Sequence, residues 1–331
     1  MTDPTAAASA AKPNYQPVSG MELPRNAGIA TFMRLPYLPV EAADGVEIGL
    51  IGLPWDGGTT TRNGSRYGPR QIREMSTLLR GINPATGTSP YDLANCADLG
   101  DAPSNPVEPD TSLRMIESFV ASLVARAIVP MVFGGDHLVS LPVLRALSRG
   151  RRLGLVHFDA HTDMYDTYYD GSRFTHGTPF RRAIEEGLID PTRTVQIGIR
   201  GTMFASDEHD WLFSQGVTHI YMDELRETGC DAVAQKIRAI VGAAPAYLTF
   251  DIDAIDPASA PGTGVPEIAG ITPYEAQRML RRLSGLDLVG ADFVEVSPPL
   301  DQTGSTALVA ANLGFEILCL LATALDARRR G

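Results

Sequence analysis

The sequence has few cysteines, no long apolar run and no excess of positive charge. Its three cysteines are odd in number and widely separated, which indicates free thiols in a reducing compartment. Gly, Pro or charged residues interrupt the apolar runs, so we expect none of transmembrane length. Residues 1–17 lack a basic segment followed by an apolar one, so no secretory signal is expected. These features together predict a cytoplasmic protein.

The formal net charge of −11 argues against nucleic acid or an anionic membrane surface as the main partner. The composition is otherwise that of an ordinary globular protein, with 44% hydrophobic and 20% charged residues. A chain of 331 residues can form two domains, but α/β proteins of this length often form one. Residues 1–20 are rich in Ala, Pro and Ser, so we expect a flexible N-terminal arm there and a single domain over residues 21–331.

Short apolar runs alternate with segments of helical pattern along most of the chain. The predicted strands cover residues 46–54, 97–99, 128–133, 153–158, 194–199, 217–221, 246–250 and 286–294. The predicted helices cover residues 69–79, 110–126, 138 onward, 179–187, 206–215, 233–241, 273–283 and 306–325. Strands that are apolar on both faces and alternate with helices are typical of a parallel sheet covered by helices on both sides. The sequence therefore predicts one α/β domain.

Polar residues follow four of these strands directly, at the ends where sites form in open α/β sheets. In the stretch LVHFDAHTD, a buried strand leads into Asp159, His161 and Asp163, whose spacing of two residues puts all three on one face of an extended chain. The other strand ends carry GGDH with Asp136 and His137, DID with Asp251 and Asp253, and FVEVSPP with Glu295. A further histidine, His176, lies in HGTPF, after DAHTD.

Taken singly, these groups have structural explanations. Asp136 can cap a helix, His137 can be a satisfied histidine of the first helical turn, and the DID aspartates can form a strand-end turn. Together, however, two histidines and four aspartates converge on one sheet edge: His137, His161, Asp159, Asp163, Asp251 and Asp253. Burying them without a cation would cost many kcal/mol in desolvation and like-charge repulsion. The set therefore indicates a metal centre.

The ligand types also indicate which metal and which chemistry. Oxygen-rich ligands with one imidazole per ion and no thiolate favour Mn²⁺ or a similar ion. Four carboxylates and two imidazoles suit two ions that share bridging carboxylates and activate a water molecule for hydrolysis. The glycine-rich loop at residues 55–70 lacks a phosphate-binding signature and is interpreted as turn chemistry. His157, His209 and His219 are interpreted as structural residues.

Five collinear motifs, GGDHLVS, DAHTD, HGTPF, DIDAIDPASAPGTGVPE and EVSPP, resemble those of the ureohydrolase family of arginase, agmatinase and the guanidino-acid hydrolases. The likeness spans about residues 21–325. It implies a three-layer α/β/α sandwich around a mostly parallel sheet, here a single ureohydrolase catalytic domain. It also implies a homo-oligomer, trimer or hexamer, and two divalent metal ions, usually Mn²⁺ and in some members Ni²⁺.

The same resemblance implies a role for each motif residue. One ion would be held by His137, Asp159, Asp163 and Asp251, and the other by Asp159, His161, Asp251 and Asp253, with Asp159 and Asp251 bridging. Hydroxide between the ions would attack the guanidinium carbon, and urea and an amine would leave. Glu295 would hold the guanidinium and His176 would pass a proton to the leaving amine, so these two residues and Asp163 form the implied catalytic set.

The resemblance is closest to the bacterial branch of guanidinopropionase, guanidinobutyrase and agmatinase-like enzymes, with guanidinopropionase nearest. It implies a small guanidino compound as substrate: 3-guanidinopropionate, 4-guanidinobutyrate or agmatine. Arginase proper would offer Asn after DAHTD, where Met164 and Tyr165 stand.

The chain departs from its own branch at Ser259, where a bulky residue is usual, and in the tyrosine-rich loop at residues 163–174. Tyr165, Tyr168 and Ser259 are therefore candidate substrate-binding residues, since tyrosine faces can bind a cation. These departures leave open a hydrolase of an N-substituted guanidine or a biguanide. A non-catalytic subunit of a hetero-oligomer is the alternative from another class, and it is disfavoured because no implied ligand is missing.

Overall fold

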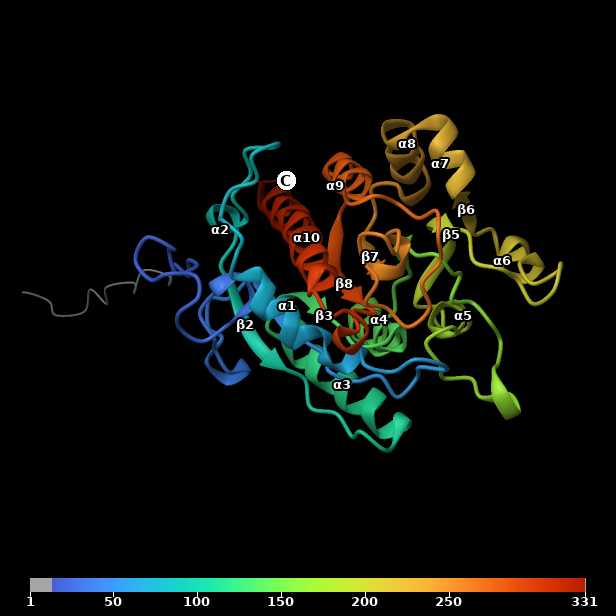
Figure 1. Cartoon of the computed structure of the whole chain (residues 1–331), viewed down its shortest axis with the longest axis horizontal. Coiled ribbons are helices and arrows are strands. Elements are labelled where there is room, and N and C mark those ends of the chain that lie inside the picture. The colour runs from blue at the N-terminus through green and yellow to red at the C-terminus, as the bar shows by residue number, and fades with distance from the viewer. Residues whose placement is uncertain (1–13, 331) are drawn as a thin grey trace, which may run out of the picture.

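The computed structural model describes residues 14–330, in which eight strands form one parallel sheet in the order β2–β1–β3–β8–β7–β4–β5–β6 (Figure 1). Its strands are β1 (Ile48–Gly52), β2 (Cys96–Asp101), β3 (Val129–Phe133), β4 (Leu153–Phe158), β5 (Ile189–Ile199), β6 (Thr218–Tyr221), β7 (Ala246–Asp251) and β8 (Leu288–Val294). All neighbouring strands in this order run parallel. The C-terminal strands β7 and β8 thus lie between β3 and β4, at the centre of the sheet.

Helices cover both faces of the sheet, as the alternating sequence pattern predicts. They are α1 (Gly68–Ser76), α2 (Pro90–Leu93), α3 (Pro109–Ala125), α4 (Ser140–Ser148), α5 (Pro179–Glu185), α6 (Asp210–Gln215), α7 (Met222–Thr228), α8 (Cys230–Val241), α9 (Pro273–Arg282) and α10 (Ser305–Arg330). One apolar core lies between the sheet and α1, α2 and α7 to α10, and a second lies between the sheet and α3 to α6. The predicted α/β/α architecture is confirmed.

The longest helix, α10, corrects one expectation. By length and composition it is apolar enough to cross a membrane, with a mean hydropathy of 2.0 over its most apolar window, whereas the sequence was expected to contain no such run. Of that window, 72% is buried inside the structure. The helix packs against β8, α1 and α9, and in Figure 1 it lies beside the last two. Its apolar composition is therefore that of a helix buried in the core.

Several element boundaries differ from the prediction. Strand β5 begins at Ile189 rather than at residue 194, because Asp190 and Pro191 are accommodated within the register shift between the pairs Leu153–Ile189 and Leu155–Thr194. Helices α2 and α7 were not predicted, and each is too short to show a clear helical period. Helix α10 continues to Arg330, beyond the predicted end at residue 325. Its last residues are polar and exposed, so no apolar period marks them in the sequence.

The predicted N-terminal arm lies partly outside the described residues, since residues 1–13 are not among them. The following segment is hydrogen-bonded to the domain. Tyr15 N donates to Asn95 Oδ1 at 3.2 Å, and Val18 N donates to Arg34 O at 3.0 Å. The mobility of residues 1–13 stays a prediction.

Four phenylalanines align the centre of the sheet. Phe133, Phe293, Phe250 and Phe158 are register partners across β3, β8, β7 and β4. The rings of Phe158 and Phe250 stack with centroids 5.0 Å apart, and those of Phe250 and Phe293 stack at 4.9 Å. Phe158, Phe250 and Phe293 precede the polar ends of their strands by one or two residues, and Phe133 precedes Asp136 by three, so the row holds those ends close to one level.

The stacking of this row predicts how substitution of its central ring changes the stability of the protein. Phe250→Ala removes the central, fully buried ring and should lower the free energy of unfolding by about 3–5 kcal/mol. Phe250→Leu keeps most of the volume and should cost about 1–2 kcal/mol. Denaturant unfolding of the two variants measures the difference, and equal costs would show that the stacked ring is not what this position needs.

The edge strand β6 carries a buried histidine. His219 is 7% exposed, and its ring lies 5.0 Å from that of His209 and 4.8 Å from that of Phe213. Burial lowers the pKa of His219 to about 3, with a further contribution from the charges of His209 and His157. The imidazole is therefore neutral in the folded protein at all but strongly acidic pH.

The lowered pKa predicts a pH dependence of stability with a definite sign. An unfolded chain binds a proton at this position below about pH 6.5, whereas the folded chain does so only near pH 3, so acid favours unfolding. Between pH 6 and pH 4, wild-type protein should lose up to about 1.4 kcal/mol per pH unit more than His219→Phe. Parallel pH profiles of unfolding for the two proteins would contradict a neutral buried His219.

Candidate metal centre

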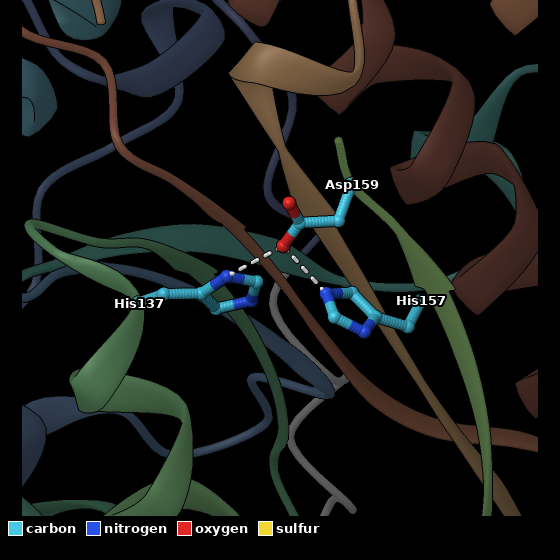
Figure 2. Close-up of side chains that lie close together, drawn as sticks. All are labelled: His137, His157 and Asp159. Carbon is cyan, nitrogen blue, oxygen red and sulfur yellow. Dashed lines mark hydrogen bonds and ion pairs between the residues drawn. The ribbon is translucent and has the colours of Figure 1, made fainter. Parts of the chain in front are cut away.

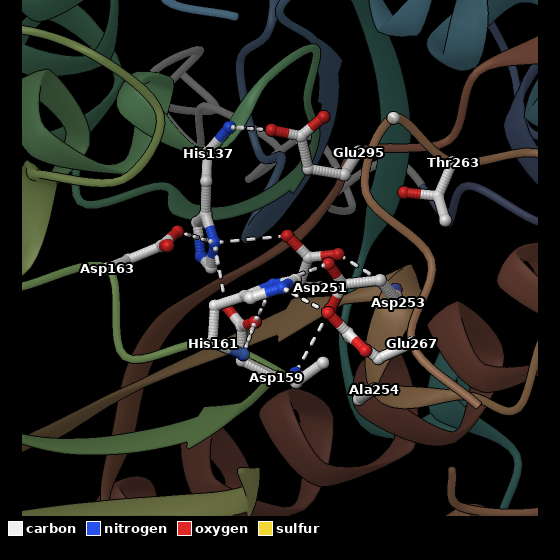
Figure 3. Close-up of polar contacts among 12 residues, drawn as sticks. His137, Asp159, His161, Asp163, Asp251, Asp253, Ala254, Thr263, Glu267 and Glu295 are labelled. Carbon is white, nitrogen blue, oxygen red and sulfur yellow. Dashed lines mark hydrogen bonds and ion pairs between the residues drawn. The ribbon is translucent and has the colours of Figure 1, made fainter. Parts of the chain in front are cut away.

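The predicted ligands meet at the carboxyl ends of the central strands (Figure 3). Asp159 directly follows β4, and Asp251 is the last residue of β7. Their preceding phenylalanines are register partners, so the two carboxylates come from adjacent positions of neighbouring strands. His137 and Asp253 lie on short 3-10 turns, His137–Val139 and Ile252–Ala254, that follow β3 and β7.

The first ligand group surrounds one nitrogen of His137. Its Nδ1 atom lies 3.1 Å from Asp159 Oδ2, 2.9 Å from Asp163 Oδ2 and 3.2 Å from Asp251 Oδ2. The nitrogen is fully buried and has no hydrogen-bond partner within residues 14–330. Adjacent ligands of an octahedral ion, each about 2.1 Å from it, lie about 3 Å apart. The spacing therefore fits a divalent cation.

The contact made by the other ring nitrogen of His137 determines which nitrogen of the neutral imidazole carries the proton. Its Nε2 lies 2.8 Å from Thr249 Oγ1, and the Thr249 hydroxyl donates its proton to the buried carboxylate of Asp292. The threonine oxygen must then accept from Nε2–H, which leaves the Nδ1 lone pair facing three carboxylate oxygens. An imidazole nitrogen aimed at acceptors alone is the arrangement of a metal ligand.

The second group shares Asp159 with the first. His161 Nδ1 lies 3.0 Å from Asp253 Oδ2 and 3.6 Å from Asp159 Oδ1. Asp159 thus presents Oδ2 to the first group and Oδ1 to the second, as a bridging carboxylate would. Asp251 lies with the first group, and its Oδ1 accepts from Asp253 N at 2.8 Å, so its bridging role stays a prediction.

The electrostatics of these groups favour positive charge. Burial, together with the charges of Asp253 and Asp159, raises the pKa of Asp251 well above its usual value. Burial and Asp159 raise the pKa of Asp253 to about 6, although His161 opposes this shift. Burial lowers the pKa of His137, yet the facing carboxylates outweigh it and hold the pKa well above its usual value. Two divalent cations would balance the charges of the four ligand aspartates.

Two of the predicted residues have left-handed backbone conformations. Asp163 has φ 50° and Glu295 has φ 63°, in a region that costs a non-glycine residue about 1–3 kcal/mol. Backbone hydrogen bonds hold both: Phe180 N donates to Asp163 O, and Glu295 N donates to Gly135 O. The surrounding fold thus maintains strained conformations that turn both side chains toward the ligand groups.

Glu295 and His176 lie together beside the first ligand group. Glu295 Oε1 accepts from His137 N at 3.0 Å and lies 3.1 Å from His176 Nδ1. Burial lowers the pKa of His176, but Glu295 outweighs burial and the pKa rises to about 9. His176 Nε2 lies 2.9 Å from Thr60 Oγ1, so the glycine-rich loop that was interpreted as turn chemistry reaches this site.

The tyrosine-rich loop flanks His176 through Gly177. Tyr165 N donates to Gly177 O at 3.0 Å, and a Cβ added at Gly177 would lie only 2.5 Å from the Tyr168 hydroxyl. Tyr165 and Tyr168 pack edge to face with centroids 5.3 Å apart. Ser259 is half-buried, and its amide donates to Asp256 O. Both tyrosines therefore stand next to the site, whereas no hydrogen bond within the described residues joins Ser259 to it.

Several polar partners of the candidate ligands were not predicted from the sequence. His157, interpreted as core, lies 2.7 Å from Asp159, and Thr249 and Asp292 support His137. Strand periodicity could have identified two of these residues, because His157 and Thr249 each precede a ligand by two positions and so share its face. Asp292 gave no such signal, since its contact with Thr249 depends on the pairing of β7 with β8.

Comparisons with known proteins identify the family of the chain. A model of the arginase family matches residues 46–320. The guanidinopropionase of Pseudomonas aeruginosa is 55% identical over 307 residues, which cover 93% of this chain and 96% of that protein. The guanidinobutyrase of the same organism is 45% identical over 93% of this chain and 97% of that protein. The solved structure of proclavaminate amidino hydrolase from Streptomyces clavuligerus superposes with a TM-score of 0.87 at 41% identity, covering 91% of this chain and 99% of that one. The chain therefore belongs to the arginase family.

Proposed function

We propose that this chain is a binuclear-metal amidinohydrolase that cleaves a small guanidino compound to urea and an amine. The observation that carries the proposal is the pair of ligand groups that share Asp159, with Glu295 and His176 beside the first. None of the six implied ligands is replaced, which speaks against a non-catalytic subunit. Membership of the arginase family and the names of the relatives support the same reaction class.

Two bound divalent cations would lower the pKa of a water molecule toward neutrality and so supply hydroxide. We assign guanidinium binding to Glu295. Its Oε1 is held by His137 N–H and His176, and its Oε2 makes no hydrogen bond within residues 14–330, so it can accept from the substrate. The pKa of about 9 keeps His176 protonated at neutral pH, so its ring carries the proton that the leaving nitrogen needs.

We propose a guanidino acid as substrate, with 3-guanidinopropionate first because the guanidinopropionase relative is 55% identical. An N-substituted guanidine or biguanide is the second candidate, and the loops beside His176 support it. Tyr165 packs against Tyr168 and Phe204, and its hydroxyl donates to Glu208. Aromatic faces beside a carboxylate suit an alkylated cation better than a carboxylate tail.

We propose Mn²⁺ as the native metal, with Ni²⁺ as the alternative, because the ligands are oxygen-rich and include no thiolate. We further propose a cytoplasmic homo-oligomer, a trimer or hexamer. The compartment is supported by the three cysteines, which are free thiols.

A urea-release screen tests the reaction and the substrate together. Protein reconstituted with Mn²⁺ or Ni²⁺ should release urea from at least one of 3-guanidinopropionate, 4-guanidinobutyrate, agmatine, arginine, N-alkylated guanidines and a biguanide. The highest kcat/KM on a guanidino acid supports the first candidate, and the highest kcat/KM on an alkylated compound supports the second. No urea from any compound, with less than one ion per chain, would instead favour a non-catalytic subunit.

Two substitutions test the separation of metal binding from proton transfer. Asp251→Asn should lose metal as well as activity, because the amide nitrogen cannot act as a ligand and a negative charge is removed. His176→Ala should keep metal near the wild-type level and lower kcat by about 10²–10⁴-fold, the usual contribution of a general acid. Metal analysis beside steady-state kinetics measures both effects. Equal metal loss in the two variants would refute the assigned roles.

A further inference from the structure

His157 lies at the end of β4, fully buried, two residues before Asp159. Figure 2 shows one oxygen of Asp159 between two imidazoles: Oδ2 lies 2.7 Å from His157 Nε2 and 3.1 Å from His137 Nδ1. The rings of His137 and His157 pack edge to face, with centroids 5.1 Å apart. The contact with His157 therefore acts on the carboxylate that both ligand groups share.

The neighbouring strand determines which nitrogen of His157 carries the proton. Gln196 of β5 is the register partner of His157, and its Nε2 lies 2.7 Å from His157 Nδ1 and 2.6 Å from Thr162 O. A carbonyl oxygen only accepts, so the end of the Gln196 amide that faces Thr162 O must be the NH₂ group. That group then donates to His157 Nδ1, and the proton of the neutral imidazole resides on Nε2, facing Asp159.

A proton on Nε2 excludes His157 as a third imidazole ligand of the centre, because a ligating nitrogen must be unprotonated. The ring is also held in place by packing, since its centroid lies 4.4 Å from that of the buried Phe180. His157 is therefore an oriented hydrogen-bond donor to a metal-ligating carboxylate, rather than a core residue that is merely satisfied.

We propose that His157, oriented by Gln196, is a positioning residue that sets the metal affinity of the centre through Asp159. This inference rests on the proposed metal centre. The donor holds Oδ2 in the direction that keeps it near His137, while His161 N donates to Oδ1 at 2.6 Å on the other side. Fixing both oxygens keeps the carboxylate in the orientation in which it could bind two ions.

Two nearly isosteric substitutions separate hydrogen bonding from packing. His157→Gln retains an N–H donor at about the reach of Nε2, whereas His157→Met fills similar space without a donor. Competition with a chelating dye should show Mn²⁺ affinity about 10–100-fold weaker for His157→Met and within about threefold of wild type for His157→Gln. Equal affinities of the Met and Gln variants, whether weakened or unchanged, would overturn the proposal. Melting temperatures of the metal-free proteins check that the two variants fold equally well.

A second variant tests the orienting role without touching Asp159. Gln196→Met removes the donor to His157 Nδ1, so the imidazole can move its proton to Nδ1 and turn a lone pair toward Asp159 Oδ2. We expect a smaller loss of Mn²⁺ affinity, about tenfold or less, and an unchanged affinity would overturn the assignment of the tautomer. Because dye competition reads metal binding alone, urea release in the same preparations distinguishes failure of this inference from failure of the proposed function.

Discussion

Four aspartate carboxylates are buried at one edge of a parallel sheet, and the rest of the structure depends on how their charge is compensated. Their mutual repulsion and loss of hydration would cost many kcal/mol, and three imidazoles supply too few protons to cancel it. The unpartnered Nδ1 of His137, aimed at three of the oxygens, is where this imbalance is most evident. A fold that keeps these groups together is organised around cations.

The sheet supplies the alignment that such a site needs. Asp159 and Asp251 are adjacent because Phe158 and Phe250 are register partners, and a slip of one strand by one residue would place the two carboxylates on opposite faces of the sheet. The same pairing sets the polar contacts behind the ligands, since β5 brings Gln196 to His157 and β8 brings Asp292 toward His137 through Thr249. The positions of the candidate metal ligands and of their polar partners therefore both depend on the strand register.

We propose that substrate choice depends on a different part of the molecule. The strand ends hold the reacting groups on rigid elements, whereas Tyr165, Tyr168 and Glu208 stand on loops beside His176. Loops can change with little cost to the core, which is how one scaffold serves relatives that act on different guanidino compounds. Under this proposal, the aromatic rings of Tyr165 and Tyr168 and the carboxylate of Glu208 would determine which guanidino compound this chain prefers.

The sequence by itself determined the fold class, the chain order of the strands and the six candidate ligands, because strand periodicity and ligand chemistry are local properties. It placed His157 in the core and the loop with Thr60 among the turns, because the partners of these residues lie far away in sequence: Gln196 is 39 residues beyond His157, and Thr60 is 116 residues before His176. Only the tertiary structure decided those contacts, together with the insertion of β7 and β8 at the centre of the sheet. Hydrogen bonds and charge interactions between distant segments depend on strand order and register, which no local pattern encodes.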